Sequence, residues 1–206
     1  MNLSRFSARR RTAFALIGAL LTALSMSQVM AQDAPKVKFS TTAGDFVVEL
    51  YPDKAPKTVE NFLQYVKDKH YDGTIFHRVI DNFMVQGGGY DAKYAEKKTR
   101  APVAHEGRDA LAKGGPRNVV GTLAMARTND PNSASAQFFI NVKDNAFLGS
   151  APVNAPQLFG YTVFGKVVSG MDVVNKMKST PTGAGGPFPS DVPKTPILVN
   201  STTLVK

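Results

Sequence analysis

The chain has 206 residues, of which 43% are hydrophobic and 20% are charged. This composition is typical of one ordinary globular domain and argues against a disordered chain. The absence of Cys excludes a disulfide framework, a thiolate metal site and a cysteine nucleophile. The net charge is +9, a value to which the first residues contribute strongly.

The first 31 residues have the pattern of a secretory signal peptide. They hold four arginines and no acidic residue, and residues 13–26 form an uncharged, mostly apolar stretch that leads to Val29 and Ala31. A basic start, a short apolar stretch and small residues before the cut are typical of a cleaved signal, whereas a spanning helix needs about 18 apolar residues or more. We predict cleavage after Ala31, by the general or the twin-arginine route, and a periplasmic domain over residues 32–206. The alternative is an uncleaved membrane anchor.

The charge of the remaining domain is mild. The signal carries four of the 25 basic residues and none of the 16 acidic ones, so its removal lowers the net charge to about +5. The longest basic cluster, residues 97–100, is interrupted by Thr99 and follows Glu96. We interpret it as a solvated loop and expect no binding to nucleic acid. After processing we expect no membrane association and a monomer.

The hydrophobic patterning predicts a mostly β domain with two helices. Short runs of strand composition, several with period-two alternation, occur in chain order over residues 37–42, 46–50, 74–80, 83–86, 119–125, 137–142, 161–168, 197–199 and 203–205. Helical spacing of apolar residues predicts one helix that has Pro56 in its first turn and ends before Asp72. A second, short helix is predicted over residues 170–177.

Two stretches have no clear period. Residues 87–117 are polar and contain Gly, so we predict a long loop with little regular structure. A loop of this length inside a compact domain usually has a functional role. Residues 179–193 are rich in Pro and Gly and could be a linker to a tail, but the strand-like residues after them predict a return to the sheet. Many short strands with two helices favour one antiparallel barrel or sandwich.

The densest motifs lie in the middle of the chain. FHRVIDNFMVQGGG spans residues 76–89, GTLAMAR spans residues 121–127, SAQFFI spans residues 135–140 and YTVFGKVVSGMDVV spans residues 161–174. In this order and spacing they resemble the cyclophilins, the cyclosporin-binding family of peptidyl-prolyl cis-trans isomerases. The resemblance extends from about residue 37 to residue 205, and the chain is most similar to the periplasmic cyclophilins of Gram-negative bacteria.

The resemblance implies a closed eight-stranded antiparallel β-barrel capped by two α-helices, with no cofactor or metal. It implies an isomerase that assists the folding of exported proteins, with proline-containing unfolded or extended polypeptides as partners. Arg78 matches the catalytic arginine of the family, with Phe83 and Gln86 beside it as further catalytic-site residues. The residues expected to bind the substrate are Met84, Ala126, Arg127, Gln137, Phe139, Phe147, Leu148 and Tyr161.

Three of these positions depart from the family pattern. Arg127 stands where the family often has Asn, Phe147 where many members have Trp, and Tyr161 where many have His. The last two changes keep an aromatic wall, so isomerase activity is expected to survive. The indole N–H is lost at Phe147, so we expect cyclosporin to bind weakly.

The chemistry of X–Pro rotation explains why an arginine and an apolar pocket are enough. The proline nitrogen regains a lone pair when the amide twists, and a guanidinium can donate a hydrogen bond to it. Other chemistries fit less well. Neither Ser133 nor Ser135 lies in G-x-S-x-G, the three His show no metal-ligand spacing, and Gly87–Gly89 lacks the Lys and helix of a P-loop. The alternative that stays open is a non-catalytic periplasmic chaperone of the same fold, for which Arg78 would have no use.

Overall fold

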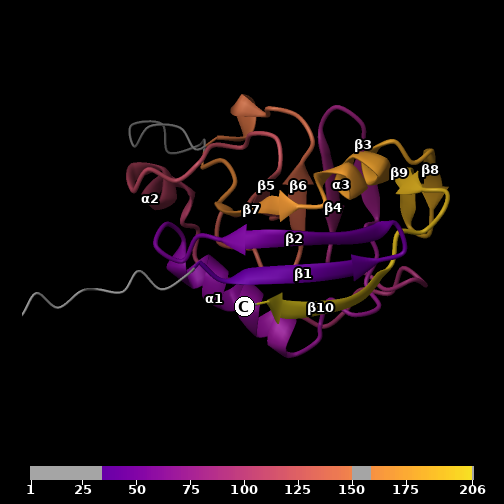
Figure 1. Cartoon of the computed structure of the whole chain (residues 1–206), viewed down its shortest axis with the longest axis horizontal. Helices are drawn as coiled ribbons and strands as arrows, with labels where there is room; N and C mark the ends of the chain where they lie inside the picture. The colour runs from indigo at the N-terminus through magenta and orange to yellow at the C-terminus, as the bar shows by residue number, and fades with distance from the viewer. Residues whose placement is uncertain (1–33, 150–158, 206) are drawn as a thin grey trace, which may run out of the picture. The chain divides into compact units, whose positions relative to one another are not determined.

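The computed structural model describes residues 34–149 and 159–205, so the predicted signal peptide lies outside the described residues. The described chain folds around one strongly curled antiparallel sheet (Figure 1). Its strands are β1 (Lys36–Thr41), β2 (Gly44–Leu50), β3 (Arg78–Ile80), β4 (Met84–Gly87), β5 (Thr122–Met125), β6 (Phe138–Asn141), β7 (Val163–Ser169) and β10 (Val199–Val205). The mostly β, eight-stranded antiparallel fold predicted from the sequence is confirmed.

The closure of the barrel differs from the prediction. The strand order is β10-β1-β2-β7-β5-β6-β4-β3, so β10 and β3 are the two edges and no ladder joins them. Single hydrogen bonds partly bridge the gap: Phe76 N–H donates to Ile197 O at 3.0 Å, and Val199 N–H donates to Thr74 O at 2.8 Å. The segment before β3 and the residues around the start of β10 are therefore joined only by isolated bridge contacts. The sheet is an open half-barrel.

The described residues contain both predicted helices and four elements that the sequence pattern did not show. The predicted helices are α1 (Pro56–Lys67) and α3 (Met171–Lys178). The short α2 (Gly107–Ala112) lies inside the stretch that was predicted to be a long loop. A hairpin of β8 (Thr182–Gly185) and β9 (Phe188–Pro193) replaces the linker-like segment, and a 3-10 turn η1 (Ala146–Leu148) precedes the undescribed residues.

The N-terminus of α1 is capped by a residue from that long stretch. Pro56 occupies the first turn, and no side chain of the preceding residues caps the helix. Instead the Glu106 carboxylate accepts hydrogen bonds from the Lys57 N–H at 3.1 Å and the Thr58 N–H at 2.8 Å. An anion at this end satisfies free N–H groups and is favoured by the helix dipole, so residues near 106 hold α1 in place.

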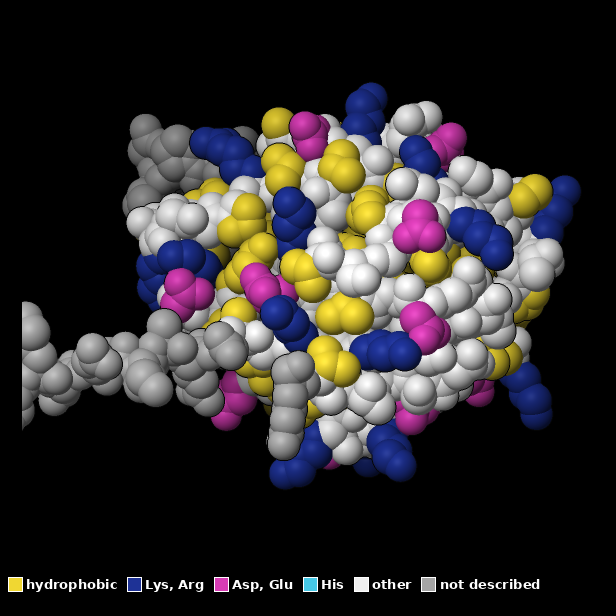
Figure 2. Space-filling view, viewed as in Figure 1, with side chains coloured by type: hydrophobic (Ala, Val, Ile, Leu, Met, Phe, Trp, Pro, Cys, Tyr) yellow, Lys and Arg dark blue, Asp and Glu magenta, His cyan; other side chains and the backbone are white. Residues whose placement is uncertain are grey.

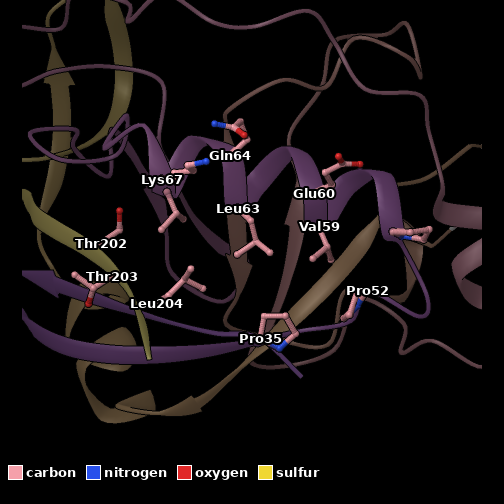
Figure 3. Close-up of a pocket in the computed structure, with 12 residues that line it drawn as sticks. Pro35, Pro52, Val59, Glu60, Leu63, Gln64, Lys67, Thr202, Thr203 and Leu204 are labelled. Atoms are coloured by element: carbon pink, nitrogen blue, oxygen red, sulfur yellow. The ribbon is translucent and has the colours of Figure 1, made fainter. Parts of the chain in front are cut away.

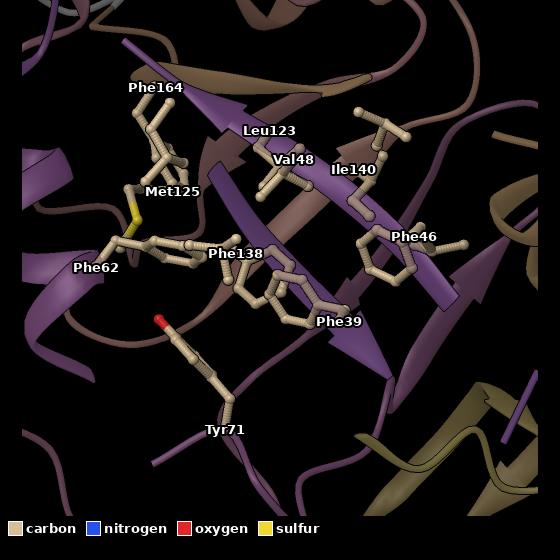
Figure 4. Packing of buried hydrophobic residues seen from close by; sticks show 14 of the residues in the cluster. Phe39, Phe46, Val48, Phe62, Tyr71, Leu123, Met125, Phe138, Ile140 and Phe164 are labelled. Carbon is tan, nitrogen blue, oxygen red and sulfur yellow. The ribbon is translucent and has the colours of Figure 1, made fainter. Parts of the chain in front are cut away.

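The inside of the curled sheet is filled with aromatic side chains (Figure 4). Phe39 stacks on Phe46 with ring centroids 4.8 Å apart, and Phe138 lies 5.5 Å from Phe39. Phe62 reaches from α1 and meets Phe138 edge-on at 5.7 Å. A curled sheet whose inside is packed in this way leaves no room for a ligand there, so we expect a binding site on the outer surface.

The visible surface is mixed in charge. On the face seen in Figure 2, Lys and Arg side chains are scattered among acidic, polar and apolar ones and do not form one basic patch. Among the described residues no helix is both long and apolar enough to cross a bilayer.

Candidate active site

The predicted site residues come together where β3, β4 and β6 lie side by side. Arg78 on β3 is directly opposite Gln86 on β4, and Gln86 is directly opposite Phe139 on β6. Cross-strand partners point to the same face of a sheet, so these three side chains form a row on one face. The strand register therefore places an arginine, an amide and an aromatic ring next to one another.

A cavity of about 180 Å³ lies over this row, and we call it the proline pocket after the ligand that the resemblance implies. Nine of the eleven predicted site residues line it: Arg78, Phe83, Met84, Gln86, Ala126, Arg127, Phe139, Leu148 and Tyr161. The other two touch its walls. Gln137 accepts a hydrogen bond from Gln86 Nε2 at 3.0 Å, and Phe147 stacks on Phe83 with ring centroids 5.8 Å apart.

The floor of the pocket is apolar and buried. Met84, Phe139 and Leu148 are 2%, 4% and 9% exposed and form a cluster separate from the main core. The Tyr161 ring meets Phe139 edge-on at 5.4 Å, an arrangement that aromatic pairs prefer. Such a floor suits a small apolar ring. By contrast, Phe147 is 75% exposed and stands at the rim.

A chain of buried asparagines holds the far wall of the pocket. Asn145 Nδ2 donates to Phe83 O at 2.8 Å and to Asn141 Oδ1 at 2.8 Å. Asn141 Nδ2 donates to Asn118 Oδ1 at 3.1 Å, and Asn118 Nδ2 donates to Leu148 O at 3.2 Å. Buried polar networks that are hydrogen-bonded in this way rigidify their surroundings. The role of these residues was not predicted from the sequence, because isolated Asn residues are typical of ordinary turns.

Arg127 forms the opposite wall and is held in place. Its Nε donates to Gly160 O at 2.9 Å and its Nη1 donates to Thr128 O at 2.7 Å. Its guanidinium carbon lies 4.7 Å from the centre of the Tyr161 ring, a cation–π contact. The side chain is therefore part of the pocket wall.

Arg78 projects between the pocket and a second cavity. Its side chain is 45% exposed, and its Nε lies 3.8 Å from Asp191 Oδ2 on β9. The second cavity, about 300 Å³, shares Arg78 and Gln86 with the proline pocket and is also lined by His77, Tyr90, Gln137 and the β9 residues Phe188–Asp191. Asp191 has φ +66°, which is uncommon but tolerated for Asp. Nothing in the sequence pattern indicated that the β8–β9 hairpin would border the site.

Two histidines near the site, His77 and His105, have lowered pKa values. Burial lowers the pKa of His77 to about 4, with a further contribution from the neighbouring Arg78 charge. Burial also lowers the pKa of His105, again with a contribution from a pocket arginine, Arg127. Both arginines thus impose a positive field on their surroundings. No group of three His, Asp or Glu in the described parts of the chain is arranged to hold a metal ion.

The Gly run after β4 serves packing. Gly88 has φ +89°, and a Cβ there would lie 2.9 Å from the Tyr71 ring. A Cβ on Gly89 would lie 2.6 Å from the Gln137 side chain. These glycines let the end of β4 pass close to residues that support the pocket.

A larger cavity lies elsewhere, between α1 and β10 (Figure 3). This α1–β10 groove has a volume of about 560 Å³ and contains no predicted site residue. Its lining is mostly apolar, with Val59 and Leu63 from α1 and Leu204 from β10. Glu60 and Lys67 are the charged residues in its lining.

Comparison with known proteins agrees with this geometry. Residues 36–204 match the family model described as cyclophilin type peptidyl-prolyl cis-trans isomerase/CLD. A peptidyl-prolyl cis-trans isomerase of Acinetobacter baylyi is 46% identical over 192 residues, 93% of this chain and 94% of that protein. Peptidyl-prolyl cis-trans isomerase B of Escherichia coli is 49% identical over 168 residues, 82% of this chain and 98% of that protein.

Solved structures give the same result. The cyclophilin type peptidyl-prolyl cis-trans isomerase of Cryptosporidium parvum, crystallised in the presence of the dipeptide Ala-Pro, superimposes with a TM-score of 0.63 at 25% identity and covers 83% of this chain and 99% of that one. The chain therefore belongs to the cyclophilin-type peptidyl-prolyl cis-trans isomerases. It is an enzyme of that class.

Proposed function

We propose that this isomerase acts on exported proteins in the periplasm, that it assists their folding, and that Arg78 in the proline pocket carries the catalysis. The observation on which the catalytic assignment rests is the position of Arg78. Its partly exposed guanidinium stands beside a floor formed by the buried Phe139 and Leu148.

The reaction requires a catalyst that lowers only a barrier. Rotation about a peptide bond faces a barrier of about 18–20 kcal/mol, whereas the cis and trans forms of an X–Pro bond differ by about 0.5–1 kcal/mol. At the top of the barrier the amide is twisted, and the proline nitrogen has lost its resonance with the carbonyl. Its lone pair is then available as a hydrogen-bond acceptor.

Arg78 supplies a donor for that lone pair. The interaction is nearly absent in the planar ground state, so it stabilises the transition state selectively. Removing one preorganised donor of this kind typically costs about 2.7–4 kcal/mol. An arginine stays charged at any working pH, so the donor is always present.

The other lining residues hold the substrate. Met84, Phe139 and Leu148 offer an apolar floor for the pyrrolidine ring, and the structure of the C. parvum relative with Ala-Pro supports a proline ligand of this kind. The Gln86 side chain is held in place by its hydrogen bond to Gln137. Its amide can bind a backbone group of the substrate next to the proline. Neither a nucleophile nor a proton transfer is needed.

The folding role is tested by the refolding of a protein whose slow phase is X–Pro isomerisation, a step that takes tens of seconds without a catalyst. We expect the wild type to accelerate this phase and Arg78→Ala to accelerate it far less. The competing function is a non-catalytic chaperone. It would raise the yield of folded protein without changing the rate of the slow phase, and Arg78→Ala would act like the wild type.

The export proposal is supported by the basic start, the apolar residues 13–26 and the Val29–Ala31 ending. We expect a soluble periplasmic protein that begins at Gln32. Intact mass and N-terminal sequencing of the exported protein test this. Recovery of the full 22.2 kDa chain from washed membranes would contradict it.

A further inference from the structure

The proline pocket is lined by two cations and no anion. Of its nine lining residues, Arg78 and Arg127 are basic and none is acidic. They stand on different walls, since Arg78 belongs to β3 and Arg127 follows β5.

Arg78 and Arg127 differ in whether an acidic residue lies close to the guanidinium. Arg78 has Asp191 at 3.8 Å on the side away from the proline pocket. Arg127 makes no ion pair with any residue in the described part of the chain; its guanidinium contacts the carbonyls of Gly160 and Thr128 and the Tyr161 ring. Asp130 is the nearest acidic residue in the sequence, and its Oδ1 accepts a hydrogen bond from Asn132 N–H.

Arg127 is also unable to move away easily. Three hydrogen bonds, to the carbonyls of Gly160, Thr128 and Asn129, and one ring contact hold the guanidinium against the wall. Its charge acts on its surroundings, since it contributes, after burial, to the lowered pKa of His105. A peptide bound in the pocket therefore meets a positive charge that is held in place next to its proline.

We propose that Arg127 determines substrate specificity and gives this isomerase a preference for an acidic side chain next to the prolyl bond. The inference rests on the proposed assignment of the proline pocket as the catalytic site. A carboxylate on the neighbouring residue gains attraction from Arg127, and an ammonium at the same place is repelled. The partly exposed setting limits the effect of one such pair to a few-fold, and the difference between an acidic and a basic substrate combines attraction and repulsion.

Two series of peptides test this proposal, one with Glu, Gln or Lys before Pro and one with the same residues after Pro. Exchange NMR gives kcat/KM for each peptide. For the wild type we expect the Glu peptide to exceed the Lys peptide by about three- to tenfold in at least one series, mainly through KM, and less at high salt. Arg127→Gln should reduce the ratio to below about twofold, and Arg127→Lys should retain part of it.

Arg100→Gln is the matched control. Arg100 pairs with Asp68 outside the pocket, so this variant removes the same charge and should keep the wild-type ratio. Equal turnover of the Glu, Gln and Lys peptides by the wild type, or a ratio that Arg127→Gln leaves unchanged, would overturn the proposal. A failure of the pocket assignment looks different, because Arg78→Ala would then turn over the neutral Gln peptide at the wild-type rate.

Discussion

The two cavities of this domain differ in size and in what their walls can do. The α1–β10 groove has about three times the volume of the proline pocket, about 560 Å³ against about 180 Å³, and it is mostly apolar. The smaller pocket holds two arginines and Gln86 around a buried floor. Apolar area alone can bind a chain, but lowering a rotational barrier requires a donor that is aimed at the reacting nitrogen. The smaller cavity is therefore the one that suits catalysis.

The largest effect on activity is expected from substitution of Arg78. Arg78→Ala should lower kcat/KM by about two to three orders of magnitude, the range for a lost preorganised donor. Arg78→Lys should recover little, because a flexible ammonium does not replace a planar guanidinium. Exchange NMR on an Ala-Pro peptide measures both variants. Peptide affinity should fall much less than the rate, since the apolar floor remains.

The wild-type rate should also be nearly independent of pH between about 6 and 9, because arginine does not titrate there. The pKa of His77 is lowered to about 4, so the histidine next to Arg78 stays neutral over this range. Wild-type catalysis by Arg78→Ala, or a bell-shaped pH profile, would mean that another residue carries the reaction.

The second effect is a pH dependence of the free energy of unfolding, caused by His77, the neighbour of Arg78. His77 is 4% exposed, and its pKa is lowered to about 4, while in the unfolded chain it is about 6.5. Between these values the unfolded chain binds more protons, so the free energy of unfolding falls as the pH falls from about 6.5 to 4. At about 1.4 kcal/mol per pKa unit the loss is on the order of 3 kcal/mol.

Urea unfolding between pH 4 and 7.5 measures this loss, and His77→Phe is the control. Its ring can keep the contacts to Tyr90 and Phe188 but cannot titrate. The slope should shrink and not vanish, since burial also lowers the pKa of His70 and of His105. Equal slopes for wild type and variant would refute the assignment to His77.

The third effect concerns the helix that forms one wall of the groove. Glu106→Gln removes the charge that accepts the Lys57 and Thr58 N–H groups, and we expect a loss of about 1–3 kcal/mol in the free energy of unfolding. The folded variant should keep kcat/KM within about twofold. Glu60→Gln, an exposed change on the same helix, should stay within about 0.5 kcal/mol. A loss of activity without a loss of stability would link α1 to the pocket.

Glu106 also illustrates what the sequence could and could not predict. Local periodicity found α1, because Val59, Phe62 and Val66 recur at helical spacing and are buried. The cap of that helix comes from a residue 48 positions away from Thr58, and no local pattern shows a contact of this kind. The same reason explains the β8–β9 hairpin. The hairpin forms a two-stranded sheet of its own and is largely exposed or half-buried. Its sequence therefore has no clear alternation of buried and exposed residues.

For the site, motif spacing predicted more than periodicity did. The eleven predicted residues lie in or against one pocket. From the alternation of hydrophobic residues alone, most of these residues would have been assigned to the core. The supporting Asn118, Asn141 and Asn145 were missed, as was Asp191 beside Arg78. These residues act through tertiary contacts, and their identity gives no local signal.

A smaller effect is expected at the rim of the pocket. Phe147 is 75% exposed and offers no ring N–H, so we expect weak cyclosporin binding. Phe147→Trp should tighten it several-fold, since a hydrogen bond to a neutral partner contributes on the order of 1 kcal/mol. Phe147→Leu, which removes the ring without adding a donor, is the control. If titration calorimetry shows no change for Phe147→Trp, the argument about the indole is wrong.

The smallest effect is expected in the groove, where the same substitution can be compared in both cavities. Leu204 lines the groove and is 58% exposed, whereas Leu148 lines the proline pocket and is 9% exposed. Leu204→Ser should change the free energy of unfolding by less than about 0.5 kcal/mol and leave kcat/KM unchanged within about twofold. Leu148→Ser removes part of the floor and should lower kcat/KM by about tenfold or more, because buried apolar contacts of this size contribute about 1.5–3 kcal/mol.

Urea unfolding and exchange NMR on both leucine variants measure these effects under one set of conditions. If Leu204→Ser lowered kcat/KM as much as Leu148→Ser, the groove would be taking part in binding the substrate chain. Its apolar area would then contribute to catalysis through binding, and the functional difference between the two cavities would disappear. The expected result separates the two roles, since only the cavity that contains Arg78 responds in activity.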